Sequence, residues 1–197
     1  MGRDKALVQF AGKPLLAHAL ALLCEAGLSA SIAGSRPELA RFAQVIADQA
    51  PNRGPLGGIC AALASTSSRW AVFLPVDLPG MPASLVAYLL RHARITGRAI
   101  TLASVNGCAQ TFPAVIDRAA LPVLQAELEA GRGGCFSSFQ AAAAGLRQPL
   151  AVLGVELLVQ AGQVVHPGGL PPARWFLNLN TPADLRRAEA HSSSLIA

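Results

Sequence analysis

The first half of the chain contains two kinds of hydrophobic pattern, one with the spacing of a helix face and one that is a continuous apolar run. Residues 14–25 carry apolar side chains at the spacing of one helix face, with a proline at the start and Gly27 as the stop. Residues 70–74 form a continuous apolar run, which is typical of a strand buried on both faces of a sheet. The pattern therefore predicts helices and strands in the same chain.

The remaining elements follow from the same patterns and from the turn residues between them. We predict strands over residues 28–34, 45–47, 100–105, 111–116 and 175–180, and helices over residues 37–44, 59–65, 83–94, 121–130, 136–144 and 182–190. Residues 145–174 are less regular. Because strands alternate with helices, we expect a mostly parallel sheet with helices on both faces. No internal repeat or linker divides the chain, so residues 1–197 are predicted to form one α/β domain.

The composition indicates a folded protein in a reducing compartment. Hydrophobic residues make up 52% and charged residues 14% of the 197 residues, which excludes a disordered chain. The mean hydropathy is +0.43, yet the most apolar stretch, residues 15–23, is far shorter than the roughly 20 residues that cross a bilayer. No secretory signal is visible, and the four cysteines form no C-x-x-C pair. We therefore expect a soluble, cytoplasmic protein with no membrane partner.

The net charge of +5 does not by itself indicate nucleic-acid binding. The arginines are spread along the chain, with no basic block and no aromatic residues interleaved among them. A modest positive balance suits a small anionic substrate at least as well. We expect no nucleic-acid partner.

The first candidate motif is M-G-R-D-K-A-L, residues 1–7. Two cations beside a glycine can wrap a triphosphate, with Lys5 as a point charge and Arg3 as a forked donor. A charged chain end without a ligand has the same composition, so spacing alone leaves both interpretations open.

The second candidate motif is L-P-V-D-L-P-G-M-P, residues 74–82. Asp77 follows the most apolar predicted strand, and three prolines and a glycine constrain the loop around it. Ligands of open α/β sheets bind beyond the carboxyl ends of the strands. Since Mg²⁺ usually binds through one or two carboxylates plus substrate phosphates, Asp77 is a candidate ligand. The alternative is an exposed aspartate in an ordinary turn.

Two further motifs bring glycine and asparagine to helix starts. Residues 52–59, N-R-G-P-L-G-G-I, place Gly54 and two more glycines where a ligand can approach the backbone, although Gly-Pro also leads into ordinary helices. Residues 178–184, N-L-N-T-P-A-D, contain a threonine cap and a proline at the first helical position. That cap does not explain Asn178 and Asn180, which would face the same way on a strand and could bind a polar ligand.

Together these motifs resemble the molybdenum cofactor guanylyltransferases, within the wider family of MobA-like transferases. That family carries a pattern like L-A-G-G-x-S-x-R-M-G-x-D-K-A-L, then G-P-L-x-G, then an acidic residue in a D-x-P turn, and an N-x-N-T-P-x-D-L ending. Residues 1–7, 54–58, 77–79 and 178–185 match these segments in order, so the resemblance spans nearly the whole chain. It implies a Rossmann-like three-layer nucleotidyltransferase fold.

The resemblance also implies roles for individual residues. Lys5 would contact nucleotide phosphates, Asp77 would bind Mg²⁺ and the nucleotide, and Asp48 would lie near the base. Asn178 and Asn180 would lie near the pterin-bearing substrate. The turn A-G-R-G-G, residues 130–134, resembles the family's cationic turn near that substrate and contains Arg132. Gln110 lies in a segment that often faces the site.

The implied reaction is transfer of GMP from GTP to the phosphate of a molybdopterin-type small molecule, with release of pyrophosphate. The sequence departs from the family pattern in two places. The L-A-G-G-x-S-x-R stretch is missing, so we expect the natural start to lie upstream of Met1. Only Arg132 carries charge in the cationic turn, so the resemblance supports the use of a nucleotide more strongly than it supports molybdopterin as the acceptor. The alternatives are a cytidylyltransferase or another nucleotidyltransferase, or an inactive truncated relative. We expect a monomer.

Overall fold

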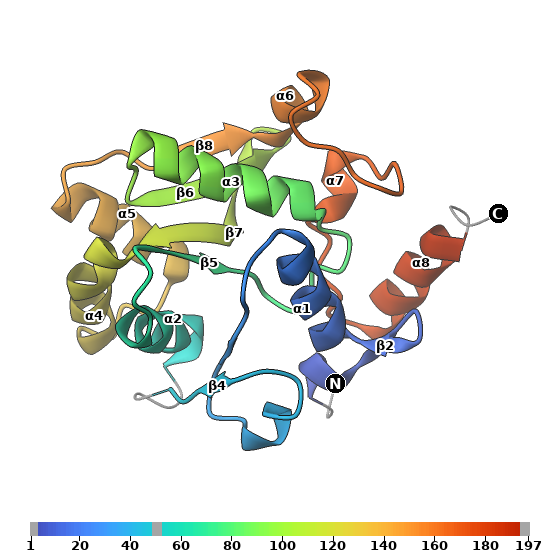
Figure 1. Ribbon diagram of the computed structural model, residues 1–197, viewed down its shortest axis with the longest axis horizontal. Helices are drawn as coiled ribbons and strands as arrows, with labels where there is room; N and C mark the ends of the chain where they lie inside the picture. Colours follow the sequence, from blue (N-terminus) through green and yellow to red (C-terminus); the bar gives the residue numbers. More distant parts are fainter. Residues whose placement is uncertain (1–3, 49–52, 194–197) are drawn as a thin grey trace.

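A four-stranded sheet with helices on both faces forms the centre of the computed structural model, which describes residues 4–48 and 53–193 (Figure 1). The strands are β1 (Gln9–Phe10), β2 (Lys13–Pro14), β3 (Ile32–Ala33), β4 (Val45–Ile46), β5 (Trp70–Phe73), β6 (Ile100–Val105), β7 (Cys108–Asp117) and β8 (Ala151–Gly154). The α-helices are α1 (Leu15–Glu25), α2 (Gly54–Ser65), α3 (Ala83–Thr96), α4 (Leu121–Glu129), α5 (Cys135–Gly145), α6 (Val155–Gln160), α7 (Pro172–Trp175) and α8 (Pro182–Ser193). Three short 3₁₀ helices are η1 (Lys5–Leu7), η2 (Pro37–Leu39) and η3 (Arg118–Ala120).

The central sheet has the strand order β5-β7-β6-β8. β7 is antiparallel to both of its neighbours and β8 is parallel to β6, so β5, β6 and β8 share one direction. The predicted α/β class is confirmed, but β7 makes the sheet mixed. The cause is the tight hairpin between β6 and β7, where Asn106 and Gly107 both have positive φ and return the chain antiparallel to β6.

β5 is less buried than its apolar sequence predicts. All four of its residues are half-buried. β5 pairs only with β7, and its other edge carries no strand among the described residues, because β3 and β4 pair with each other in a separate parallel sheet. The predicted strand is therefore present, but the expectation that it is fully buried on both faces is wrong.

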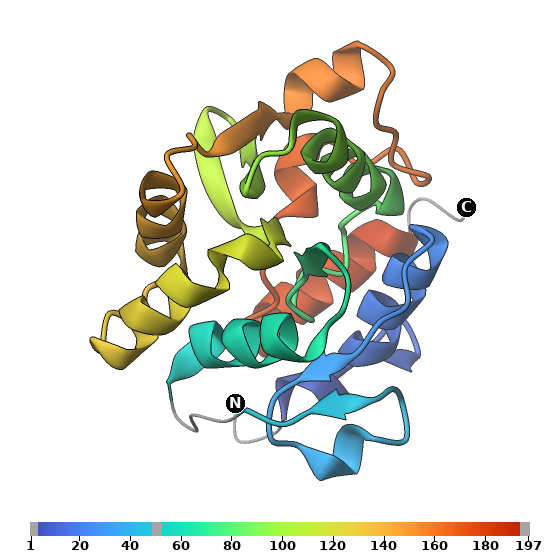
Figure 2. The same cartoon turned by 60° about the vertical axis from the view of Figure 1, so that its left-hand side comes forward.

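Two apolar clusters lie on the two faces of the central sheet. Leu102 of β6 joins the cluster formed with α2, α4 and α5, which includes Leu124 and Phe139. Ala103, one residue along the same strand, joins the cluster formed with α3 and α7, which includes Leu89 and Trp175. Figure 2 shows α5 and α3 on opposite sides of the sheet. Alternate residues of the strand thus supply two cores, as the period of a strand requires.

Several predicted elements are corrected. Residues 175–180 form no strand: α7 ends at Trp175, and the chain then runs irregularly except that the Leu179 N–H donates to the Asp77 carbonyl at 3.0 Å. The helix expected over residues 37–44 is only the short η2. The irregular region 145–174 contains β8, α6 and α7, each too short to show a period. No helix among the described residues has the length and apolar character to cross a membrane.

Candidate functional site

Asp77 lies in the loop that follows β5, at the carboxyl end of the strand. Its backbone carbonyl accepts the Leu179 N–H, which attaches the C-terminal segment to this loop. Its side chain is 17% exposed, and its Oδ1 atom is buried with no hydrogen-bond partner among the described residues. A buried carboxylate oxygen without a partner costs free energy unless a ligand completes its coordination.

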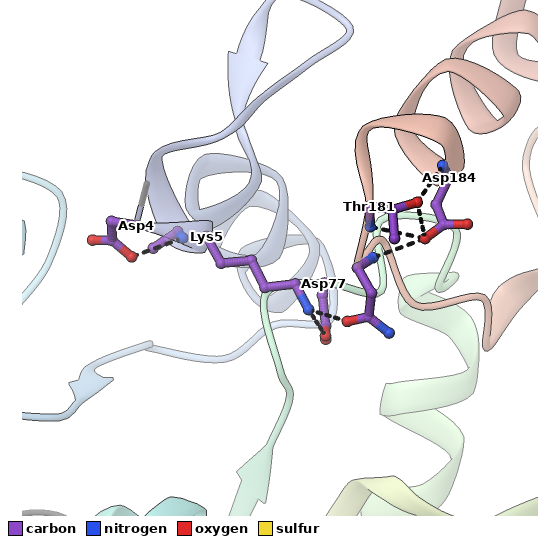
Figure 3. Close-up of polar contacts among 7 residues, drawn as sticks. Asp4, Lys5, Asp77, Thr181 and Asp184 are labelled. Carbon is purple, nitrogen blue, oxygen red and sulfur yellow. Dashed lines mark hydrogen bonds and ion pairs between the residues drawn. The ribbon is translucent and has the colours of Figure 1, made fainter. Parts of the chain in front are cut away.

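Lys5 reaches this carboxylate from the start of the chain. Its Nζ donates to Asp77 Oδ2 at 2.6 Å and to Asn180 Oδ1 at 2.5 Å, as the side chains in Figure 3 show. These three residues are called the Lys5 cluster below. One predicted cation, Lys5, and one predicted anion, Asp77, therefore meet, together with Asn180, one of the two predicted asparagines. The cluster joins segments that lie 72 and 175 residues apart.

Asp4 lies next to Lys5 in the chain and caps the short helix that begins there. Its Oδ1 accepts the Ala6 N–H at 3.1 Å and so caps η1, which begins at Lys5. Its Oδ2 forms an ion pair with Arg36, whose Nε also donates to Glu38 at 2.9 Å. The hydrogen bond to Glu38 and the charge of Asp4 raise the pKa of Arg36. Sequence analysis missed Arg36, because nothing in its spacing marks it as a partner of Asp4.

Asn180 is positioned by the cap of α8. The Thr181 hydroxyl accepts the Asp184 N–H at 3.1 Å, and Asp184 Oδ2 accepts the Thr181 N–H at 2.9 Å, which is a reciprocal capping box. The same oxygen accepts the Asn180 N–H at 3.2 Å. Hydrogen bonds from the Thr181 hydroxyl and backbone lower the pKa of Asp184. The predicted threonine cap is confirmed, and it also orients the backbone of Asn180.

A second candidate region lies between α2 and α4. A cavity of about 180 Å³, called the α2 pocket below, is lined by Asp48, Arg53, Gly57, Cys60, Ala61, Gln125, Leu128 and Glu129. Arg53 Nη1 donates to the Leu128 carbonyl at 3.0 Å and so joins the start of α2 to the end of α4. Burial raises the pKa of Cys60 to about 11, so its thiol is no nucleophile at neutral pH.

Two glycines of α2 give this pocket its shape. Gly54 begins the helix with φ +66°, a conformation that side chains rarely adopt. A Cβ on Gly57 would lie 2.8 Å from Asp48 Oδ2 and 2.9 Å from Oδ1, so only glycine lets this carboxylate approach the helix. Asp48 thus lies against the G-P-L-G-G segment, while the approach of a ligand to this segment stays a prediction.

The remaining predicted residues do not join the Lys5 cluster. Arg132 is exposed and donates to both carboxylate oxygens of Glu127, at 2.9 and 2.7 Å. Its turn lies near the α2 pocket, since a Cβ on Gly133 would come within 3.8 Å of the Arg53 carbonyl. Asn178 is exposed and has no polar partner in the described part of the chain. Arg3 lies outside the described residues.

Gln110 is directed to its own strand rather than to either region. Its Nε2 donates to the Cys108 carbonyl at 3.0 Å, at the exposed end of β7. The structure therefore gives no contact between Gln110 and the Lys5 cluster among the residues it describes.

The Lys5 cluster fits Mg²⁺ only together with a ligand. No group of three or more histidine, cysteine, aspartate or glutamate side chains is gathered anywhere in the described chain. Asp77 Oδ1 is nevertheless a buried oxygen with no partner among the described residues. Mg²⁺ keeps several waters and often binds through one or two carboxylates plus substrate phosphates, so a single carboxylate is compatible with a nucleotide-borne ion.

Sequence comparison finds relatives that carry the name molybdenum cofactor guanylyltransferase. A molybdenum cofactor guanylyltransferase from Xanthomonas euvesicatoria is 42% identical over 92 residues, covering 46% of this chain and 47% of that protein, so the matched segment spans about half of that relative. A molybdenum cofactor guanylyltransferase from Pseudomonas putida is 33% identical over 134 residues, covering 66% of this chain and 70% of that protein.

The fold is similar to that of a solved structure. The crystal structure of molybdopterin-guanine dinucleotide biosynthesis protein A from Archaeoglobus fulgidus has a TM-score of 0.77 and 21% identity, covering 98% of this chain and 92% of that one. The family described as the MobA-like NTP transferase domain matches residues 1–149, which include Lys5, Asp48 and Asp77. Because this match covers more than half of the sequence, the chain belongs to the family of MobA-like NTP transferase domains.

Proposed function

We propose that this protein transfers GMP from GTP to the terminal phosphate of a molybdopterin-type cofactor and releases pyrophosphate. The observation that carries the proposal is the Lys5 cluster, in which Lys5 Nζ lies between Asp77 and Asn180 while Asp77 Oδ1 has no described partner. The names of its relatives support the choice of nucleotide and acceptor.

The reaction is an in-line displacement at the α-phosphorus of GTP. A phosphate oxygen of the acceptor forms a bond to that phosphorus, and the bond to the oxygen that bridges to the β-phosphate breaks, so that pyrophosphate leaves with the electron pair. A phosphate monoester is already largely dianionic at neutral pH, so no general base is required. His18, His92, His166 and His191 lie outside all the motifs above, in agreement with this mechanism.

Catalysis then depends on position and charge. The ammonium group of Lys5 offsets negative charge on the phosphates, and its two hydrogen bonds fix its direction before the substrate arrives. Asp77 Oδ1 would hold Mg²⁺, which when bound supplies charge neutralisation at the phosphate oxygens. Arg3 would add a second cation from the segment that precedes Lys5.

Base recognition is assigned to the α2 pocket. The Asp48 carboxylate accepts hydrogen bonds only, and guanine presents adjacent N–H donors on its pairing edge. Gly57 leaves room for this carboxylate beside the helix. The Arg132 turn, close to Arg53, would contact the acceptor.

The direct test is a transfer assay with molybdopterin, Mg²⁺ and GTP, CTP or ATP in turn, measuring pyrophosphate and the dinucleotide product. We expect GTP to be preferred, Asp77→Asn to abolish turnover, and Glu25→Gln, which changes an exposed carboxylate at the end of α1, to retain it. A preference for CTP would assign the chain to the cytidylyl alternative. Turnover by a folded Asp77→Asn variant would overturn the assignment of Asp77.

A further inference from the structure

The loop that carries Asp77 rests on α7. This loop, residues 74–82, is called the Asp77 loop below, and its Met81 is buried in the same apolar cluster as Trp175 of α7. A Cβ on Gly80 would lie 3.0 Å from the Arg174 carbonyl oxygen and 3.7 Å from Trp175 Cα. Backbone therefore meets backbone at this point, and the absence of a side chain on Gly80 permits the contact.

His166 organises the chain that leads into α7. Its Nδ1 accepts the Gly168 N–H at 3.0 Å and the Leu170 N–H at 3.3 Å. Its ring stacks on the indole of Trp175, with the two ring centroids 5.9 Å apart and an interplanar angle of 27°. The Trp175 Nε1 in turn donates to the Leu170 carbonyl at 2.7 Å. One imidazole ring thus folds the turn before α7 against the side chain of its buried tryptophan.

These contacts determine which nitrogen of His166 carries the proton. A ring nitrogen that accepts N–H groups has no proton of its own, so in the neutral ring the proton lies on Nε2. Burial lowers the pKa of His166 and so favours the neutral ring, while a hydrogen bond to the Gly80 backbone opposes this shift. Because Nδ1 is already an acceptor, the Nε2 N–H is the group that can donate to the Gly80 carbonyl. The ring therefore connects the turn before α7 to the Asp77 loop.

The Asp77 loop and α7 together determine where Asn180 lies relative to Asp77. From α7 the chain continues through residues 176–179 to Asn180, and the Leu179 N–H donates to the Asp77 carbonyl at 3.0 Å. Asp77 and Asn180 are the two acceptors of the Lys5 ammonium group. A shift of the Asp77 loop along α7 would therefore change the relative position of both acceptors.

We propose that His166 is a positioning residue for nucleotidyl transfer, because its ring holds the Asp77 loop against α7 and thereby fixes Asp77 and Asn180 around Lys5. The inference rests on the proposed function, in which Lys5 and Asp77 act on the phosphates of the nucleotide. His166 itself is neither acid nor base in the reaction. Its two nitrogens have separate tasks: Nδ1 orders the turn before α7, and Nε2 connects this turn to Gly80. The Nε2 contact is the one that reaches the Lys5 cluster.

Two amide substitutions separate the tasks of the two nitrogens. In His166→Asn the Oδ1 atom can take the place of Nδ1 and accept the Gly168 N–H, whereas in His166→Gln the longer amide can donate to Gly80 as Nε2 does. We expect His166→Asn to lower kcat about tenfold with KM for GTP unchanged, and His166→Gln to retain most of kcat. Wild-type kcat in His166→Asn would overturn the proposal.

The Mg²⁺ requirement distinguishes positioning from a loss of folded enzyme. His166→Asn should need a higher Mg²⁺ concentration for half-maximal rate, because Asp77 is the proposed ligand of the ion. A smaller folded fraction lowers the rate but leaves this concentration unchanged. Phe139→Leu is the control, since Phe139 is fully buried on α5, in the cluster on the opposite face of the sheet, and its truncation lowers stability without touching the Asp77 loop.

Gly80→Ala tests the same contact from the other side. Its Cβ would lie 3.0 Å from the Arg174 carbonyl oxygen, so the Asp77 loop must move away from α7, and kcat should fall as it does in His166→Asn. Since both changes break one contact, their combination should be no slower than the slower single variant. Losses that add in the double variant would show that His166 does not act through Gly80, and they would overturn the proposal.

Amide hydrogen exchange of the full chain without substrate keeps this proposal separate from the proposed function. In His166→Asn we expect faster exchange in residues 74–82 and 176–181, whereas Phe139→Leu should have its effect around α5. Exchange in the Asp77 loop that is as slow as in the wild type would overturn the role of His166. Faster exchange in a protein that transfers no GMP would support the contact and overturn the proposed function instead.

Discussion

The Lys5 cluster and the α2 pocket are built by opposite means. In the Lys5 cluster, charged and polar side chains from three distant segments converge, and each one fixes another: Lys5 bridges Asp77 and Asn180. In the α2 pocket the decisive feature is a missing side chain, because Asp48 can lie against the helix only where Gly57 has no Cβ. One region depends on groups that are present, and the other on space that is kept free.

This difference determines how each region responds to substitution. A substitution that removes a charge from the Lys5 cluster removes a group that would act on the phosphates, and it leaves the backbone intact. A methyl group added to the α2 pocket removes no functional group, but it displaces the Asp48 carboxylate. We therefore expect the first kind of change to lower kcat and the second to raise KM for the nucleotide.

The largest effect is expected for Lys5→Met. This change removes the only described cation that bonds to Asp77, so charge that develops on the phosphates is no longer offset, and kcat should fall about 100- to 1,000-fold. Steady-state kinetics measures this loss. Lys13→Met, at the only other lysine in the sequence, is the control and should remain active. Equal activity of both variants would remove Lys5 from the proposed mechanism.

A smaller effect is expected for Gly57→Ala. The new Cβ would lie 2.8 Å from Asp48 Oδ2, so the carboxylate must move, and KM for GTP should rise about tenfold with little change in kcat. Gly58→Ala, one position along α2, is matched to it, because its Cβ would meet the Ala33 Cβ at 3.4 Å rather than a carboxylate. If the two variants have the same KM, Asp48 plays no part in nucleotide binding.

The smallest effect is expected for Thr181→Ala. Losing the hydroxyl cap of α8 should cost about 1 kcal/mol of stability and loosen the position of Asn180. Denaturant unfolding measures the first effect, and the GTP titration curve measures the second. Thr181→Ser keeps a capping hydroxyl and should restore both. A variant that is destabilised but kinetically normal would show that α8 stabilises the fold without positioning Asn180.

Sequence patterns predicted features that arise locally and missed those that arise from packing. The helix at residues 14–25, the Asn106-Gly107 turn and the threonine cap of α8 are all present, since each depends on neighbouring residues. The position of Asp77 in the loop after a strand was also predicted, and the structure places it after β5. The Asp4–Arg36 pair and the half-burial of β5 depend on segments far apart in the chain, and no period reports them.

Asn178 and Asn180 were predicted to face the same way because a strand was expected over residues 175–180, and the structure has no strand there. Alternation along a predicted strand placed Asn178 and Asn180 on one face, but the chain is irregular there, and only Asn180 bonds to Lys5. A single backbone hydrogen bond between Leu179 and Asp77 holds this segment in place of a ladder. Sequence patterns singled out both asparagines, but they did not show that Asn180 is the one that bonds to Lys5.

The distance along the chain between Lys5 and Asn180 also sets an order of events during synthesis. A ribosome releases Lys5 and Asp77 long before Asn180, so a growing chain holds the ammonium and carboxylate groups without the amide that completes their arrangement. Phosphates that meet such a chain would find an unfinished site. Because Asn180 is synthesised after all four strands of the central sheet, the Lys5 cluster can be completed only after the segments that form this sheet have been made.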